Sequence, residues 1–132
     1  MRAMGFKILV VDDEPDIVQV VSNRLTREGF DVATAFDGDE ALAKFPAFDP
    51  DLILLDLIMP KLNGFEVLKQ VREKYTDRWR PVIIISAKTE LETLRKSYDM
   101  EADHYLSKPC GMDVILRGIE TMRSLIPLRI KQ

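Results

Sequence analysis

LILLDLIMP, residues Leu52 to Pro60, contains the strand from which the rest of the chain can be understood. Its four consecutive aliphatic residues predict a short strand buried on both faces, so other elements must cover it from both sides. The run ends in a carboxylate, Asp56, which is therefore expected where a buried strand opens to solvent. Taken alone, an acid in this position most often starts a turn. Whether Asp56 has a further role depends on the residues that the neighbouring strands place beside it.

Apolar patterns on both sides of this stretch predict an alternation of strands and helices. Aliphatic and β-branched runs predict strands at residues 7–11, 31–35, 81–86 and 103–107, in addition to 52–56. Apolar residues at helical spacing predict helices at about 13–28, 41–45, 65–75, 90–100 and 114–126. Gly29 is expected to stop the first helix, Pro46 the second and Pro127 the last.

The order of these elements predicts the fold class. Because each strand is followed by a helix, every link between strands is a crossover connection. The sheet is therefore expected to be parallel, with helices on both faces, as in a doubly wound α/β domain. Ligands of such sheets bind beyond the carboxyl ends of the strands, and functional residues are expected there.

The composition is that of one globular domain. The chain has 132 residues, 46% hydrophobic and 31% charged, enough for a core without disulfides or a structural metal. A formal charge of −3 argues against strong attraction to nucleic acid or to an anionic membrane. Cys110 is the only cysteine, and no apolar run approaches the roughly 20 residues of a membrane span. We expect a cytoplasmic protein with no membrane contact.

Polar side chains stand at the ends of four predicted strands. The first strand leads into Asp12 and Asp13, the third into Asp56 and the fifth into Lys108, while the fourth ends at Ser86. Clustered carboxylates repel one another unless a cation compensates, and Mg²⁺ prefers oxygen ligands and is often shared with a phosphoryl group. An aspartate can itself accept a phosphoryl group as a mixed anhydride, with a lysine and a hydroxyl neutralising the charge. The strand ends therefore predict phosphoryl chemistry at one edge of the sheet.

The chain as a whole resembles the CheY-like receiver domains of response regulators in two-component signalling. The matching motifs, in receiver-like order and spacing, are VVDDEP at 10–15, DLILLDLIMPKLNGFEVL at 51–68, IIISAK at 83–88 and ADHYLSKP at 102–109. The resemblance implies a flavodoxin-like sheet of five strands in the order 2-1-3-4-5, with five helices. It also implies a single receiver domain over residues 1–132, with its core at about 6–126 and no output domain.

The same resemblance implies a phosphoacceptor and a metal site. Asp56 would accept the phosphoryl group. Asp12 and Asp13 would hold Mg²⁺ (or Mn²⁺), together with an oxygen of Asp56 and the backbone carbonyl of Ile58. Lys108 would pair with the phosphoryl oxygens.

Two further residues would report phosphorylation, again by resemblance. Ser86 would hydrogen-bond a phosphoryl oxygen on activation, and the rotamer of Tyr105 would follow Ser86. The Lys108–Pro109 peptide bond would be cis.

The implied function is a phosphorylation-activated switch that receives its phosphoryl group from a histidine kinase or phosphotransfer protein. It would be a regulator that promotes its own phosphorylation and dephosphorylation, and not a turnover enzyme on a separate substrate. The surface of helix 4, strand 5 and helix 5, roughly residues 91–125, would carry the signal to a partner or output domain and could form a homodimer. The charged residues there are Glu92, Arg95, Lys96, Asp99, Asp103 and Arg117.

Two other classes of function are open from the residues alone. A phosphorylation-independent interaction module with a receiver fold is one, although such a protein should have lost part of the acid cluster or Lys108. A flavodoxin-like carrier or an Asp-nucleophile phosphatase is the other. The first strand lacks a Gly-rich phosphate loop, and no second aspartate follows two residues after Asp56, which argues against both.

Several conspicuous residues have simpler interpretations. Asp13 is an acceptable helix N-cap. His104 should point to the opposite side of its strand from Tyr105, and Cys110 should be a small apolar filler. Trp79, in the loop before the fourth strand, should be partly packed.

Three positions depart from the receiver pattern. Met100-Glu101 stands where a glycine is common, so the turn before the fifth strand is expected to differ. Lys88 places a flexible cation near the mouth of the site. Ile58, two residues after Asp56, cannot orient an attacking water as an amide would, so slow hydrolysis of the acyl phosphate is predicted.

Overall fold

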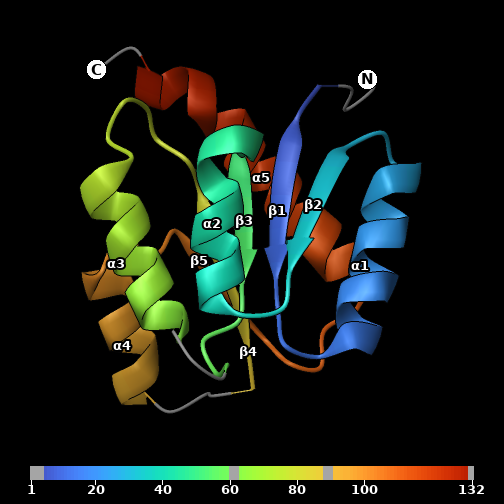
Figure 1. The fold of residues 1–132 in the computed structure, drawn as a ribbon, viewed down its shortest axis with the longest axis horizontal. Helices are drawn as coiled ribbons and strands as arrows, with labels where there is room; N and C mark the ends of the chain where they lie inside the picture. Colours follow the sequence, from blue (N-terminus) through green and yellow to red (C-terminus); the bar gives the residue numbers. More distant parts are fainter. Residues whose placement is uncertain (1–4, 60–62, 88–90, 131–132) are drawn as a thin grey trace.

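A parallel sheet of five strands forms the centre of the computed structural model, which describes residues 5–59, 63–87 and 91–130. The strand order is β2-β1-β3-β4-β5, as the receiver resemblance implied (Figure 1). The strands are β1 (Lys7–Val11), β2 (Asp31–Ala35), β3 (Leu52–Leu55), β4 (Val82–Ser86) and β5 (His104–Ser107). The position of Lys88 lies outside the described residues.

Helices cover both faces of the sheet. In Figure 1, α2 lies in front of the sheet and α5 lies behind it. Residues of α1 and α5 pack in one buried cluster, whereas residues of α2 and α3 pack in the other. The helices are α1 (Pro15–Arg27), α2 (Gly38–Phe48), α3 (Gly64–Lys74), α4 (Leu91–Asp99) and α5 (Met112–Ile130). The doubly wound α/β prediction is confirmed.

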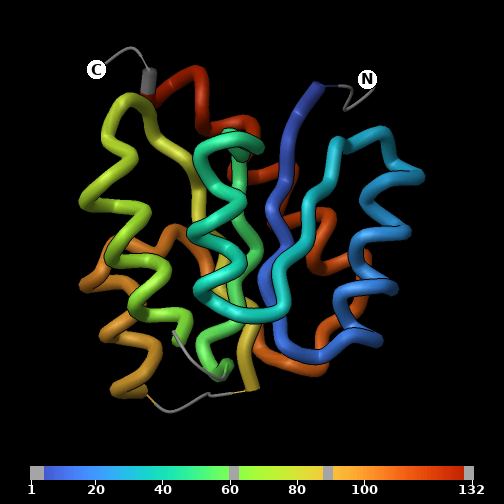
Figure 2. Tube along the Cα trace, viewed as in Figure 1, coloured from blue at the N-terminus to red at the C-terminus, as the bar shows by residue number. Residues whose placement is uncertain are grey.

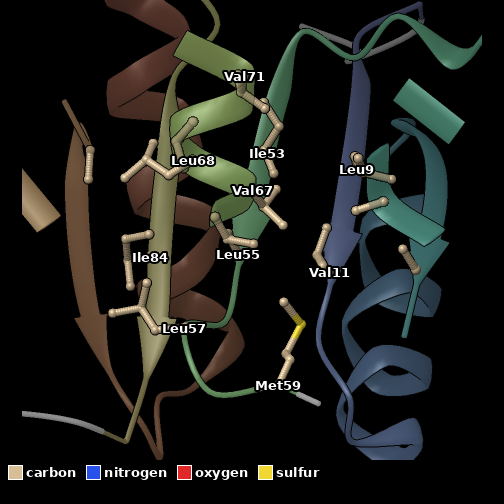
Figure 3. Close-up of a cluster of buried hydrophobic side chains, with 14 of the residues drawn as sticks. Leu9, Val11, Ile53, Leu55, Leu57, Met59, Val67, Leu68, Val71 and Ile84 are labelled. Carbon is tan, nitrogen blue, oxygen red and sulfur yellow. The ribbon is translucent and has the colours of Figure 1, made fainter. Parts of the chain in front are cut away.

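Alternation along the strands divides the core into two layers. In β1, Leu9 and Val11 face α2 and α3, whereas Ile8 and Val10 face α1 and α5. Figure 3 shows the first layer, where Leu55 and Ile53 of β3 lie among side chains of α3. Each fully buried aliphatic side chain contributes about 1.5–3 kcal/mol. The continuous LILL run of β3 is required because both of its faces are buried.

The two prolines expected to end helices do not do so. Pro46 lies inside α2, which continues to Phe48, and Pro127 lies inside α5, which continues to Ile130. A proline in the last turns of a helix removes one backbone hydrogen bond, and packing beyond it can outweigh that loss. Beyond Pro46, Phe48 packs against the core. Beyond Pro127, the guanidinium of Arg129 lies 4.2 Å from the ring centre of Trp79.

The first helix begins at Pro15 and not at about residue 13 as expected. Its N-cap is Glu14 and not Asp13, since Pro15 occupies the first helical position, where its fixed backbone angle is favourable. Its end matches the prediction, because Gly29 adopts a left-handed backbone conformation directly after the last turn.

The turn before β5 is built on a strained residue. Glu101 has a φ of 69°, a conformation that favours glycine, and the next amide, that of Ala102, bonds to the carbonyl of Ser97. The predicted departure at Met100-Glu101 is therefore a glycine-like turn made without glycine.

Candidate functional site

The ends of the strands are held together by backbone hydrogen bonds that continue the sheet into its loops. The amide of Asp12 donates to the carbonyl of Ala35, and that of Asp56 donates to the carbonyl of Val11. The amide of Lys108 donates to the carbonyl of Ser86 at 2.9 Å. In Figure 2 the blue turn after β1 and the orange turn before α5 meet at the lower edge. The predicted strand-end residues are thus brought to one edge by the ladder itself.

Four carboxylates gather at this edge. Asp12, Asp13, Glu14 and Asp56 each offer an oxygen, and these atoms lie within 4.8 Å of one another. The side chains of Asp12 and Asp56 are almost fully buried, while Glu14 is exposed. Such a set of hard oxygen donors fits Mg²⁺, which binds through a few carboxylates and retains several waters. The residues predicted as metal ligands therefore fit this ion.

Among the described residues, one cation faces these acids. The ammonium of Lys108 lies 2.8 Å from an oxygen of Asp12, 2.8 Å from an oxygen of Glu14 and 3.3 Å from an oxygen of Asp56. Only 13% of the Lys108 side chain is exposed, so these contacts are partly shielded from solvent. Glu14 was not predicted to take part. The signal was present in DDEP, because Pro15 places Glu14 at the N-cap, beside the two site acids.

Burial and neighbouring charge shift the proton affinities of the central pair. Burial raises the pKa of Asp56 to about 6, the hydrogen bond from the Ile58 amide and the nearby Lys108 lower it, and the charge of Asp12 adds to the rise. Burial lowers the pKa of Lys108, but bonds to Asp12 and Glu14 outweigh that effect and raise it. At neutral pH, Asp56 is mostly an ionised, relatively basic carboxylate beside a charged lysine.

The backbone around Asp56 leaves no room for a side chain at Gly64, the first residue of α3. The amide of Ile58 donates to an oxygen of Asp56 at 3.2 Å. A Cβ on Gly64 would lie 2.3 Å from the backbone oxygen of Asp56 and 2.6 Å from the Cα of Leu57. Glycine is therefore needed where α3 starts. This steric role was missed from the sequence, although a glycine shortly after a functional strand end is a usable signal.

The remaining predicted residues surround this centre. Ser86 is completely buried at the end of β4. Tyr105 packs against the α2–α3 layer, whereas His104 packs against Gly118 of α5, so the two point to opposite sides of β5 as predicted. The side chain of Ile58 is 52% exposed. The Lys108–Pro109 bond is cis.

Cys110 and Trp79 have packing roles, and Asp103 does not lie on the surface where it was predicted. Cys110 packs against the α1–α5 layer, where burial raises the pKa of its thiol. The indole of Trp79 donates to Asp103 at 3.1 Å. Asp103, expected on a charged dimer surface, turns inward instead, 2.6 Å from Arg72. Arg72 of α3, the indole of Trp79 and the amide of Val82 hold it there.

Comparison with known proteins identifies the family. The sequence profile of the "Response regulator receiver domain" matches residues 8–120. The chain belongs to this family. The receiver domain is 45% identical over 106 residues to the alkaline phosphatase synthesis transcriptional regulatory protein PhoP of Bacillus subtilis, covering 80% of this chain and 43% of PhoP.

Solved receiver structures share its fold. The chemotaxis protein CheY4 of Vibrio cholerae is 35% identical, with a TM-score of 0.84 over 90% of this chain and 98% of CheY4. The response regulator TrrA of Thermotoga maritima, solved in complex with Mg²⁺-BeF, is 34% identical, with a TM-score of 0.77 over 88% of this chain and 97% of TrrA. The chain spans about half the length of the curated relatives it matches.

The family establishes the general function. The receiver domain is a phosphorylation-activated signalling switch of two-component systems and a regulator rather than a turnover enzyme. Receiver domains bind Mg²⁺ at an acidic pocket and interact with histidine kinases or phosphotransfer proteins. Among the described residues of this receiver domain, no helix is both long enough and apolar enough to cross a membrane.

Proposed function

We propose that Asp56 is the phosphoacceptor of this receiver domain. The observation that carries the proposal is the Lys108 ammonium, which lies between Asp56 and Asp12 in a cluster of four carboxylates. The backbones of both Asp56 and Lys108 are held by hydrogen bonds at the strand ends, so the fold brings the two side chains to the same site. A nucleophile and the cation that neutralises its product are therefore preorganised.

The transfer uses the charge states already present. An oxygen of the Asp56 carboxylate forms a bond to phosphorus as the bond from phosphorus to a donor histidine nitrogen breaks. The leaving imidazole retains the electron pair of that bond, and Asp56 becomes a mixed anhydride. Lys108 is charged, and its ammonium neutralises the phosphoryl oxygens that arrive beside it. The domain in this way promotes its own phosphorylation.

Asp12 and Asp13 would hold Mg²⁺, with an oxygen of Asp56 and the backbone carbonyl of Ile58 completing the protein ligands. The ion supplies charge neutralisation and orientation for the phosphoryl group. Asp12 is also fixed through its other contacts, because it accepts the amide of Glu14 at 3.0 Å and pairs with Lys108.

The conformational change that follows phosphorylation would then pass from β4 and β5 to the surface. Ser86 reports the phosphoryl group through its hydroxyl, and Tyr105 follows by changing rotamer. The responding surface comprises α4, β5 and α5. Its available charges for a homodimer are Glu92, Arg95, Asp99 and Arg117, since Asp103 pairs with Arg72 and Lys96 lies over the ring of Phe65.

The donor protein would dock over a groove of about 700 Å³ between α1 and α5. This groove opens beside Asp56 and Lys108 and is lined mainly by apolar side chains, among them Val20, which is 60% exposed. Val20→Asp should slow transfer from a phosphohistidine protein while leaving labelling by a small phosphodonor unchanged. An equal effect on both donors would contradict this docking site.

The test of the acceptor is Mg²⁺-dependent labelling with acetyl phosphate or phosphoramidate, followed by intact-mass analysis. The wild type should gain one phosphoryl group, and Asp56→Asn should gain none. Asp31→Asn, which removes an exposed carboxylate from β2, is the matched control and should label like the wild type. Labelling that survives in Asp56→Asn would overturn the assignment.

The lifetime of the product depends on Ile58 in this proposal. Its exposed aliphatic side chain stands two residues after Asp56 and cannot orient a hydrolytic water. Ile58→Asn should shorten the acyl-phosphate half-life, measured by loss of label after removal of the donor, whereas Ile58→Leu should not. An unchanged or longer half-life in Ile58→Asn would refute the role of this side chain.

A further inference from the structure

Glu14 makes an ion pair that its position in the helix does not require. It is the N-cap residue of α1, yet its side chain forms no capping hydrogen bond. Its own amide is bonded to Asp12 at 3.0 Å. The carboxylate instead reaches across to the residue after β5, where an oxygen lies 2.8 Å from the ammonium of Lys108. The side chain therefore forgoes a local bond for a contact 94 residues along the chain.

The contact with Glu14 occupies one of the few hydrogen-bond donors of Lys108. A lysine ammonium has three donors, and Lys108 lies close to three acceptors, which belong to Asp12, Glu14 and Asp56. The Asp56 contact is the longest of the three, at 3.3 Å against 2.8 Å for the others. Glu14, the most exposed of the three acceptors, thus competes with Asp56 for the donors of this ammonium.

We propose that Glu14 is a positioning residue for Lys108, which draws the ammonium away from Asp56 in the unphosphorylated protein and so restrains phosphoryl acceptance. The inference rests on the proposed function of Asp56. When a phosphoryl group arrives, its oxygens compete with the Glu14 carboxylate for the same donors, and the lysine must release Glu14 to neutralise them.

The size of the restraint follows from exposure. The Glu14 side chain is 57% exposed, whereas Lys108 is 13% exposed, so the pair is partly screened by solvent. An ion pair of this kind should change the labelling rate by about threefold, and the effect should shrink as ionic strength rises.

The test compares three substitutions in the full chain. Glu14→Gln keeps the shape and removes the charge. Glu14→Asp keeps the charge but shortens the reach. Asp16→Asn is the control, because it removes an exposed carboxylate from the same end of α1 that has no ion pair with Lys108. Rates are measured with acetyl phosphate and Mg²⁺ over a range of donor concentrations.

A positioning role predicts that Glu14→Gln and Glu14→Asp both label about threefold faster than the wild type at saturating donor, while Asp16→Asn does not. A mere charge effect on donor attraction would instead accelerate Glu14→Gln and Asp16→Asn alike, at low donor concentration only, and would overturn the proposal. So would unchanged rates in Glu14→Gln.

A second measurement needs no phosphodonor. The side-chain ammonium resonance of Lys108, followed by NMR without Mg²⁺, should shift in Glu14→Gln and Glu14→Asp but not in Asp16→Asn. An unmoved resonance would refute the contact. Absence of labelling in the wild type would instead count against the function proposed for Asp56, so the two failures are distinguishable.

Discussion

The two ends of the sheet both carry clusters of charge, but the charges are compensated to different degrees. At the carboxyl end, one ammonium faces four carboxylates in the part of the chain that the structure describes. At the amino end, three guanidinium groups face four carboxylates and also donate to backbone carbonyls. The amino-end cluster consists of Arg72, Arg78, Arg80, Asp49, Asp51, Asp77 and Asp103.

The difference separates a functional cluster from a structural one. Arg72 bonds to the carbonyls of Arg80 and Glu101 and to Asp103, so its fork is occupied by fixed partners. Arg80 is similarly committed, with its guanidinium bonded to the carbonyl of Pro50 and to Asp49. Among the described residues, negative charge is in excess at the carboxyl end, and a divalent cation and a phosphoryl group would complete the proposed site there.

The largest effect on stability is expected when the amino-end charge cluster is disrupted. Arg72→Met should lower the free energy of unfolding by about 3–5 kcal/mol, because it leaves the half-buried Asp103 without its cation. Arg72→Lys keeps the charge but not the fork and should cost less. Urea unfolding measures both. A loss below about 1 kcal/mol for Arg72→Met would show that this end is not a structural clamp.

Removing a negative charge from the carboxyl end of the sheet should raise the free energy of unfolding. Burial raises the pKa of Asp56 to about 6, so the fold favours its protonated form. That favourable contribution is complete below about pH 4 and is lost as the pH rises through 6. Asp56→Asn, neutral at every pH, should therefore be more stable than the wild type by about 1–3 kcal/mol at pH 8.

The pH profile is the decisive measurement for Asp56→Asn. Without Mg²⁺, its stability advantage in urea unfolding should decline below pH 6 and vanish near pH 4. A constant difference across this range would mean that the buried charge is not its cause.

A divalent cation should restore the missing compensation. Mg²⁺ at ten times its dissociation constant should stabilise the wild type by about 1.4 kcal/mol. The gain should be small in Asp13→Asn and unchanged in Arg72→Met, because the two ends of the sheet share no contact. Urea midpoints with MgCl₂ and with KCl of equal ionic strength measure it. An equal gain in Asp13→Asn would argue against this residue as a ligand.

The same contrast explains what could be predicted from the sequence. Most of the carboxyl end was predictable because Asp12, Asp56 and Lys108 directly follow predicted strands, and parallel strands bring their ends together. Asp12, Asp56 and Lys108 therefore met as expected. The amino-end cluster was not predictable. Arg78 lies in a loop and pairs with Asp51, 27 residues away, with no periodic pattern to connect them.

Helix ends were the least predictable part of the fold. Propensity places a stop at Pro46 and at Pro127, but Phe48 and Arg129 beyond them find partners in the tertiary structure. Those contacts are non-local, so no local sequence signal carries them. Glu14 was missed for a different reason. It directly follows the two site acids in DDEP, but its own contact with Lys108 forms only in the folded sheet.

The smallest effect concerns Glu101, the strained residue that the amino-end cluster holds in place. Its carbonyl accepts two bonds from Arg72, at 3.0 and 2.8 Å, while its backbone has a φ of 69°. Glycine relieves the strain of a left-handed residue but loses more entropy on folding, so Glu101→Gly should gain only about 0.5 kcal/mol. Glu101→Ala removes the carboxylate but keeps the Cβ and should gain nothing. If both variants gained equally in urea unfolding, the charge of Glu101 beside Asp103, and not its backbone, would be the source of strain.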